Sequence, residues 1–251
     1  MISKPLLCVH GHFYQPPRMD PFTGRYRYES EASPYYNWNE RVTAECYAPN
    51  VLAGNFDRIS FNLGFTLAQW MASETADIFS QIVQIVHNQH RRYGVGNGLA
   101  QAMHHTILPL ARGRDKRCQI RWGVASYQYW FGYHPDGLWL PEMAVDYETL
   151  EAVSEAGLWF VVLSDEQVRG DLSLGAGPYK VPLSQDTFMT VFVRDRGLSN
   201  YLSFDMPKPD EVRSWINETM RARRRGSLSL IATDGETFGH HHRHGVDVLH
   251  A

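Results

Sequence analysis

Short apolar runs alternate along this chain with longer stretches in which apolar residues recur at helical spacing. The clearest run is LWFVVL at residues 158–163, an unbroken apolar stretch that is typical of a strand buried on both faces. This alternation predicts repeated β/α units and a parallel sheet. We expect seven strands, at residues 6–9, 58–63, 98–101, 137–140, 158–163, 189–193 and 228–232.

Helical patterns fill the intervals between these strands. The longest covers residues 67–92, where apolar residues recur at helical spacings, namely Trp70, Phe79, Ile82, Ile85 and Val86. Further helices are expected at residues 114–131, 145–156 and 209–224. Seven strands with helical crossovers favour a single α/β domain over residues 1–251, a seven-stranded β/α barrel that is an incomplete TIM-like barrel. A doubly wound open sheet is the competing topology.

The segment from residue 13 to residue 55 shows no clear periodicity. It is rich in Tyr, Pro, Asn and Glu. Loops of this length are usually functional, so we expect the segment to contribute to a site.

Composition narrows the class of protein. The net charge of -3 gives no indication of a nucleic-acid or anionic-membrane partner. Cys8, Cys46 and Cys118 are odd in number and form no CxxC pair, which favours reduced thiols and argues against a disulfide framework or a structural zinc site. No apolar stretch reaches the roughly 18 residues of a membrane span, so we expect a soluble, cytoplasmic protein of undetermined oligomeric state.

Four polar clusters follow predicted strands, at the end where β/α barrels carry their active sites. His10 and His12 follow the first strand, and Glu142 comes after the fourth strand and a proline. A third cluster, at residues 194–201, is either a substrate loop or a charged turn. The fourth cluster follows the last strand and holds Asp234, Glu236 and the histidines 240–242.

Glu142 and Asp234 are expected on different strands but at the same rim of the barrel. Cleavage of a glycosidic bond needs two such carboxyl groups, one on each side of the bond. The aromatic content of 13% suits either sugar recognition or an aromatic-rich core.

Five stretches of this chain resemble glycoside hydrolase family 57, whose members include α-amylases, 4-α-glucanotransferases and glycogen branching enzymes. GLWLPE resembles the region that carries the nucleophile, and ATDGETFGHHH the region that carries the acid/base aspartate. Asn200 stands where an aspartate is usual in a further stretch, RDRGLSNYLSF. The other two stretches are HGHFYQPP and NGLAQAMHHTILPLA.

The resemblance implies a retaining mechanism on an α-glucan oligosaccharide or polysaccharide, without a metal or another cofactor. It gives Glu142 the role of nucleophile and Asp234 the role of acid/base. The residues expected to line the site around the cleaved bond are His10, His12, Trp139, Glu236 and His240. Family members usually continue into a helical region after the fourth motif, so we expect this chain to be truncated before that region.

Two alternatives stay open at the level of sequence. A metal-dependent polysaccharide deacetylase would use His10, His12 and one of the histidines 240–242 as ligands of a metal that activates water. A catalytically inactive, carbohydrate-binding barrel would bind glucans without turning them over.

Overall fold

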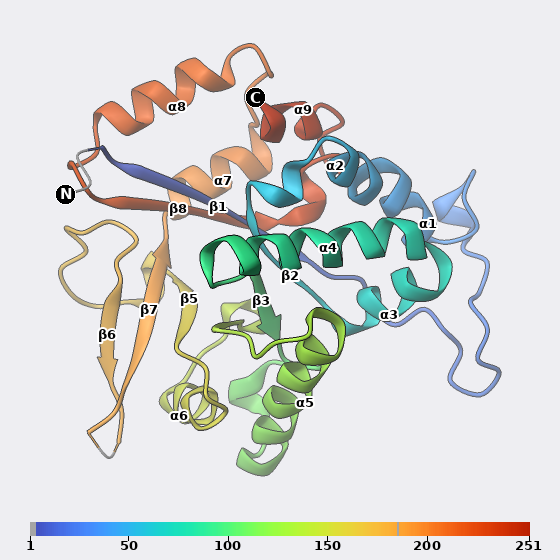
Figure 1. The fold of residues 1–251 in the computed structure, drawn as a ribbon, viewed down its shortest axis with the longest axis horizontal. Coiled ribbons are helices and arrows are strands. Elements are labelled where there is room, and N and C mark those ends of the chain that lie inside the picture. Colours follow the sequence, from blue (N-terminus) through green and yellow to red (C-terminus); the bar gives the residue numbers. More distant parts are fainter. Residues whose placement is uncertain (1–3, 185) are drawn as a thin grey trace.

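The computed structural model describes residues 4–184 and 186–251, and its eight strands form one sheet (Figure 1). The order across the sheet is β6-β7-β5-β4-β3-β2-β1-β8, and every pair of neighbours is parallel except β6 and β7. The strands are β1 Leu6–Phe13, β2 Ser60–Leu63, β3 Gly98–Gln101, β4 Gly137–Trp139, β5 Phe160–Ser164, β6 Tyr179–Pro182, β7 Phe188–Arg194 and β8 Leu228–Asp234.

The seven parallel strands are the seven that the apolar runs predict, and the sheet curves into an incomplete barrel. The first and last strands of its parallel part, β7 and β8, are joined by single hydrogen bonds and not by a ladder. The backbone N–H of Asp195 donates to the carbonyl of Leu230 at 2.8 Å, and Ala176 bridges Val193 and Leu228. The predicted fold class is therefore confirmed.

The strand count of seven needs a correction, because β6 adds an eighth strand. β6 pairs antiparallel with β7 and lies outside the ring of parallel strands. Its sequence, YKVP, has no buried residue, so it lacks the apolar run by which the others were found.

Helices surround the sheet (Figure 1). The predicted helix at residues 67–92 is divided at Thr75, whose φ of -137° and ψ of 50° are not helical. The helical regions that were not predicted include α7 and the pair α1 and α2, which are joined by a π-helical turn at Thr43–Tyr47. The α-helices are α1 Trp38–Val42, α2 Ala48–Leu52, α3 Phe65–Glu74, α4 Ala76–Tyr93, α5 Gly113–Phe131, α6 Tyr147–Glu155, α7 Arg196–Phe204, α8 Val212–Arg221 and α9 Gly245–His250.

The main core lies between the outer face of the sheet and these helices. Trp70 of α3 and Ile82 of α4 are almost fully buried there, and so are Phe61 of β2 and Ile120 of α5. Burial of side chains of this size contributes about 1.5–3 kcal/mol each, so this layer holds the barrel wall in place. Within the described ranges, none of the helices has the length and apolar character needed to cross a membrane.

Candidate active site

Two adjoining cavities lie at the carboxyl ends of the strands, with volumes of about 410 and 360 Å³. His12, Glu142 and Asp234 line both of them. We call this pair of cavities the carboxylate cleft. β4, which precedes Glu142, and β8, which ends at Asp234, stand on opposite sides of the ring of parallel strands, so the cleft crosses the mouth of the barrel between them.

Glu142 projects into the cleft from a strained turn. β4 ends at Trp139, and after Pro141 the residues Glu142 and Met143 both adopt left-handed backbone conformations, with φ values of 55° and 50°. Such conformations cost non-glycine residues roughly 1–3 kcal/mol each and cluster at functional sites. The turn is held by a 2.7 Å hydrogen bond from the Met143 N–H to the Leu140 carbonyl, and it leaves 66% of the Glu142 side chain exposed.

Asp234 ends β8, directly opposite His12 in the register of β8 with β1. The walls of the cleft partly desolvate its carboxyl group, and this raises the pKa of Asp234. His241 acts in the opposite direction, while the negative charge of Glu142 adds to the increase. The environment thus shifts the pKa of Asp234 in the direction that an acid catalyst needs.

Glu236 follows Asp234 through a tight turn. β8 does not continue past Asp234, and Gly235 is needed there because a Cβ atom would lie 2.2 Å from the Phe13 ring. Glu236 is 7% exposed, still lines the cleft, and accepts a 2.5 Å hydrogen bond from the Tyr47 hydroxyl. Its burial raises the pKa of Glu236 to about 7.

His240 lines the same side of the cleft and is held by Glu45. The Nδ1 atom of His240 is 2.5 Å from a Glu45 carboxylate oxygen, and Arg243 donates to the other oxygen at 2.8 Å. Burial alone would raise the pKa of Glu45, but hydrogen bonds from His240, Arg41 and Arg243 lower it. Glu45 and Tyr47 show that the segment without periodicity contributes to the site, as expected.

Three aromatic rings form a stack beneath the cleft. Trp139 is stacked with His12 at 5.2 Å and with His10 at 4.8 Å between ring centroids. His12 and Trp139 line the cleft, whereas His10 is fully buried and lines neither of its cavities. The structure therefore places His10 one layer below the other predicted site residues.

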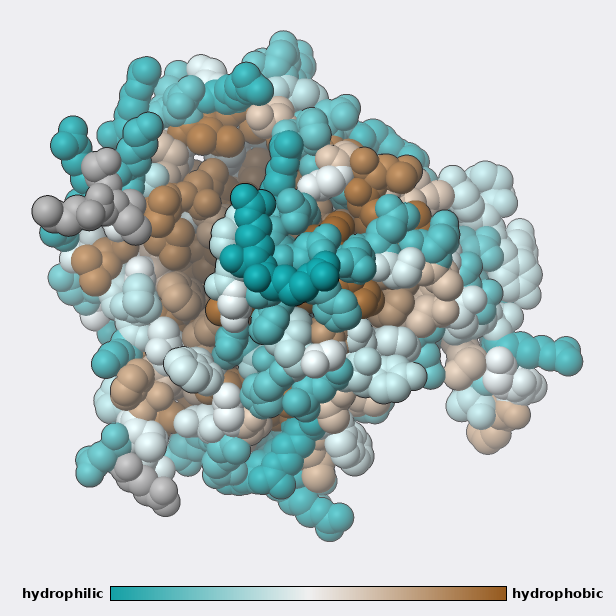
Figure 2. All heavy atoms as spheres, viewed as in Figure 1, coloured by the Kyte–Doolittle hydropathy of each residue, from teal (hydrophilic) through white to brown (hydrophobic). Residues whose placement is uncertain are grey.

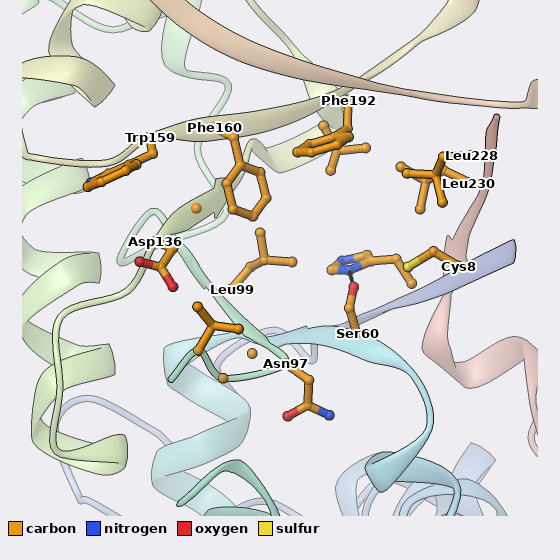
Figure 3. Close-up of a pocket in the computed structure, with 16 residues that line it drawn as sticks. Cys8, Ser60, Asn97, Leu99, Asp136, Trp159, Phe160, Phe192, Leu228 and Leu230 are labelled. Carbon is orange, nitrogen blue, oxygen red and sulfur yellow. Dashed lines mark hydrogen bonds between the residues drawn. The ribbon is translucent and has the colours of Figure 1, made fainter. Parts of the chain in front are cut away.

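His10 belongs instead to a separate apolar cavity of about 540 Å³ inside the barrel. Figure 3 shows Cys8 and Ser60 toward one end of this cavity, and Trp159 and Asp136 toward the other. On the face drawn in Figure 2, hydrophobic residues line a hollow in the region where β1, β8 and β5 lie in Figure 1. Glu142 and Asp234 do not line this cavity, so it is distinct from the carboxylate cleft.

His105 is a site residue that sequence reasoning did not single out. It follows β3, its Nδ1 atom lies 3.7 Å from a Glu142 carboxylate oxygen, and its Nε2 atom lies 3.1 Å from Nε2 of His12. Arg194 and Asn200 of the third polar cluster also line the cleft. The signal for His105 was its place four residues after a predicted strand, in a stretch quoted only for its resemblance.

The histidines that a deacetylase would use do not converge. Both ring nitrogens of His10 are occupied, by Ser60 and Asn62, and His240 is held by Glu45. In residues 4–184 and 186–251, no three side chains of the metal-binding types His, Cys, Asp and Glu are grouped so that they could hold an ion.

Comparison with protein families matches residues 27–249 to the model of glycosyl hydrolase family 57. Among solved structures, a 4-alpha-glucanotransferase from Thermococcus litoralis is similar with a TM-score of 0.70 and 19% identity, over 94% of this chain and 34% of that one. A family 57 branching enzyme from Thermococcus kodakaraensis gives a TM-score of 0.73 and 16% identity, over 98% of this chain and 67% of that one.

A putative polysaccharide deacetylase from Mycobacterium smegmatis has a TM-score of 0.60 and 12% identity, over 94% of this chain and 78% of that one. These likenesses show the fold alone. The chain spans about a third of the length of the glucanotransferase and two thirds of that of the branching enzyme. The search of curated proteins found no match.

Proposed function

Since the chain belongs to glycosyl hydrolase family 57, we propose that it forms the catalytic barrel of a retaining hydrolase or transferase of α-glucans. The observation that carries the proposal is the position of two carboxyl groups in one cleft. Glu142 and Asp234 come from different strands and line the same two adjoining cavities. Retaining cleavage needs two carboxyl groups that face one glycosidic bond.

Glu142 is the proposed nucleophile. Its carboxylate attacks the anomeric carbon and forms a covalent glycosyl ester, while the bond from that carbon to the leaving oxygen breaks. Asp234 is the proposed acid/base. It gives its proton to the leaving oxygen, and in the second step it takes a proton from the water or sugar hydroxyl that attacks the ester. The raised pKa of Asp234 suits the first of these tasks.

The lining of the cleft suits a sugar chain. Trp38 and Tyr14 line one cavity, and Trp139 and Phe204 line the other. Flat rings pack against the apolar faces of pyranose units, while carboxylates and imidazoles bind their hydroxyl groups. Because Glu142 and Asp234 belong to both cavities, we propose that sugar units of the substrate occupy the cleft on both sides of the bond that is cleaved.

The α-glucan substrate is also suggested by the fold neighbours, which include a glucanotransferase and a branching enzyme. The test is incubation with maltoheptaose followed by sizing of the products. Shorter products alone would mean hydrolysis, longer products would mean transfer, and new α-1,6 links would mean branching.

Two controls accompany this experiment. Glu142→Ala should abolish turnover, and treatment with a chelator should leave it unchanged. Turnover that requires an added metal ion would contradict the two-carboxylate mechanism. Binding of maltooligosaccharides without any turnover would favour an inactive, carbohydrate-binding barrel.

A further inference from the structure

A continuous chain of hydrogen-bonded side chains runs through the interior of the barrel, from the apolar cavity to the carboxylate cleft. We infer that all donors in this chain of hydrogen bonds point the same way along it. This fixes the tautomers of its three histidines, so that His105 always turns an N–H toward Glu142. Its catalytic consequence rests on the proposed function. The members in order are Ser60, His10, Asn62, His12 and His105.

The direction follows from the amide orientations of Asn62 and Gln101 in the structure. Nδ2 of Asn62 donates to Oε1 of Gln101 at 2.5 Å, an acceptor that cannot donate in return. The amide of Asn62 thus has Nδ2 toward Gln101 and Oδ1 toward His10. Its nitrogen then has one hydrogen left, and the nearest acceptor for it is Nδ1 of His12 at 2.9 Å. Asn62 and Gln101 are both buried, so water does not compete for these groups.

The proton positions beyond Asn62 follow in turn. His12 accepts at Nδ1, so in its neutral form it carries its hydrogen on Nε2. Nε2 lies 3.1 Å from Nε2 of His105, which must therefore accept. The single hydrogen of a neutral His105 is then on Nδ1, the atom that lies 3.7 Å from the Glu142 carboxylate. Burial lowers the pKa of His12 to about 3 and also lowers the pKa of His105, so both rings are neutral at pH 7.

The other end of the chain agrees with this direction. Oδ1 of Asn62 lies 3.1 Å from Nε2 of His10 and accepts its hydrogen. Nδ1 of His10 is then an acceptor, and the hydroxyl of Ser60 lies 2.6 Å away to donate to it. A hydroxyl rotates to donate or to accept, so Ser60, which lines the apolar cavity in Figure 3, closes the chain without conflict.

With this amide orientation, the reverse direction leaves one donor unsatisfied and creates one repulsive contact. If Nδ1 of His12 donated to Oδ1 of Asn62, the second hydrogen on the Asn62 nitrogen would lose its acceptor. His105 would then donate from Nε2 and turn the lone pair of Nδ1 toward the carboxylate of Glu142. A buried donor without a partner costs about 1–3 kcal/mol, and a lone pair facing an anion is repulsive.

The forward direction gives Glu142 a neutral, fixed N–H in place of a charged imidazolium. At 3.7 Å the N–H lies beyond hydrogen-bonding distance, so its dipole stabilises the ionised carboxylate before attack less strongly than a hydrogen bond or a full positive charge would. Glu142 therefore keeps its nucleophilicity when it attacks. Asn62 and His105 are in this sense positioning residues, because neither forms or breaks a covalent bond.

The first test needs only the unmodified protein. Long-range ¹H–¹⁵N correlation spectra at pH 7 report which ring nitrogen of a histidine carries the hydrogen. Replacing each of the three histidines in turn identifies its signals. We expect Nε2–H for His10 and His12 and Nδ1–H for His105. Nδ1–H on His12, or Nε2–H on His105, would overturn the inference even if the protein cleaves glucans.

The second test reverses the direction by substitution. The carboxylate introduced by Asn62→Asp can only accept hydrogen bonds, so at pH 8 we expect His12 to carry its hydrogen on Nδ1. The matched control is Gln101→Glu, which adds the same charge to the same network but leaves Gln101's position as an acceptor. His12 should keep its Nε2–H tautomer there.

The catalytic readout separates positioning from binding. For Asn62→Asp we expect kcat to fall about tenfold or more with KM changed by less than about threefold, because the donor acts on charge at Glu142 and not on the bound sugar. Unchanged kcat together with a reversed His12 would overturn the catalytic part of the inference. The expected tautomers in a protein without any glycosidic activity would count against the proposed function and leave the direction of the chain intact.

Discussion

The hydroxyl of Tyr47 donates a 2.5 Å hydrogen bond to the carboxylate of Glu236, across 189 positions of sequence. Both side chains are buried, and Gln15 donates to the Tyr47 oxygen from the other side at 3.3 Å. This contact ties the π-helical turn at Thr43–Tyr47 to the turn that follows β8. It therefore fixes one wall of the carboxylate cleft.

Tyr47→Phe should lower the free energy of unfolding by about 1–3 kcal/mol, because it leaves a buried carboxyl group without its donor. Urea denaturation measures the change. The matched control is Tyr36→Phe, which removes an exposed hydroxyl whose hydrogen bond to the Tyr26 carbonyl is 3.3 Å long. We expect that change to stay within about 0.5 kcal/mol. Equal changes in the free energy of unfolding would show that the Tyr47–Glu236 contact stabilises the protein no more than an exposed tyrosine hydroxyl does.

Glu236 should make the stability of the protein depend on pH. Its pKa is about 7 in the folded state and about 4.3 in an unfolded chain. The folded state thus binds more protons between these values, and the free energy of unfolding falls as the pH rises through this interval. Glu236→Gln removes the group that titrates, so it also removes this fall in the free energy of unfolding. We expect the variant to gain stability relative to the wild type by a few kcal/mol between pH 5 and pH 8. A pH-independent difference would contradict this.

The regular part of the fold could be predicted because each parallel strand is a buried apolar run. LWFVVL at residues 158–163 overlaps β5, and the runs before Glu142 and Asp234 became β4 and β8. β6 was not predicted because its sequence contains no buried apolar run. α7 was not predicted because RGLSNYLSF follows a charged pair that suggested a turn. A buried strand or helix has a recognisable pattern of apolar residues in its sequence, whereas an exposed hairpin has none.

The chemistry of the cleft was predictable only in part, for a related reason. Glu142 and Asp234 stand directly after apolar runs, so their place at the rim could be inferred. The residues that contact the site from distant parts of the sequence could not be inferred. His105 reaches Glu142 from the segment that follows the neighbouring strand β3, and Glu45 reaches His240 from a segment without periodicity. The burial of His10 below the cleft depends equally on the stack with Trp139, which no linear pattern records.

The fully buried ammonium group of Lys116 gives a prediction about the barrel wall. It donates to Asp146 at 3.1 Å and to Glu148 at 3.0 Å. Asp146→Asn keeps an N-cap side chain for α6 but removes one charge, and we expect a loss of about 1–3 kcal/mol. The double variant with Lys116→Met should be more stable than Asp146→Asn alone, since no buried charge is then left short of a partner. Simple additivity in urea denaturation would contradict this reason.

The two carboxyl groups of the cleft should respond differently to removal. Glu142→Ala lacks the atom that attacks the anomeric carbon, so it should not be labelled by a slow fluoro-sugar with a good leaving group. Asp234→Ala should still be labelled by the same compound, because a good leaving group needs little protonation. Mass spectrometry of the intact protein measures the label. Labelling of Glu142→Ala but not of Asp234→Ala would reverse the assigned roles.

Azide should rescue Asp234→Ala and not Glu142→Ala. In Asp234→Ala the glycosyl ester still forms from an activated substrate, but no base remains to deprotonate water for its hydrolysis. Azide is an anion that attacks without losing a proton, and it fits the space that the removed carboxyl group leaves. It should therefore restore turnover and yield a glycosyl azide of retained configuration, because two successive inversions at the anomeric carbon restore the starting configuration. A product of inverted configuration from this variant would contradict the covalent intermediate on Glu142, and wild-type activity on glucan in both variants would remove the basis for placing the reaction in this cleft.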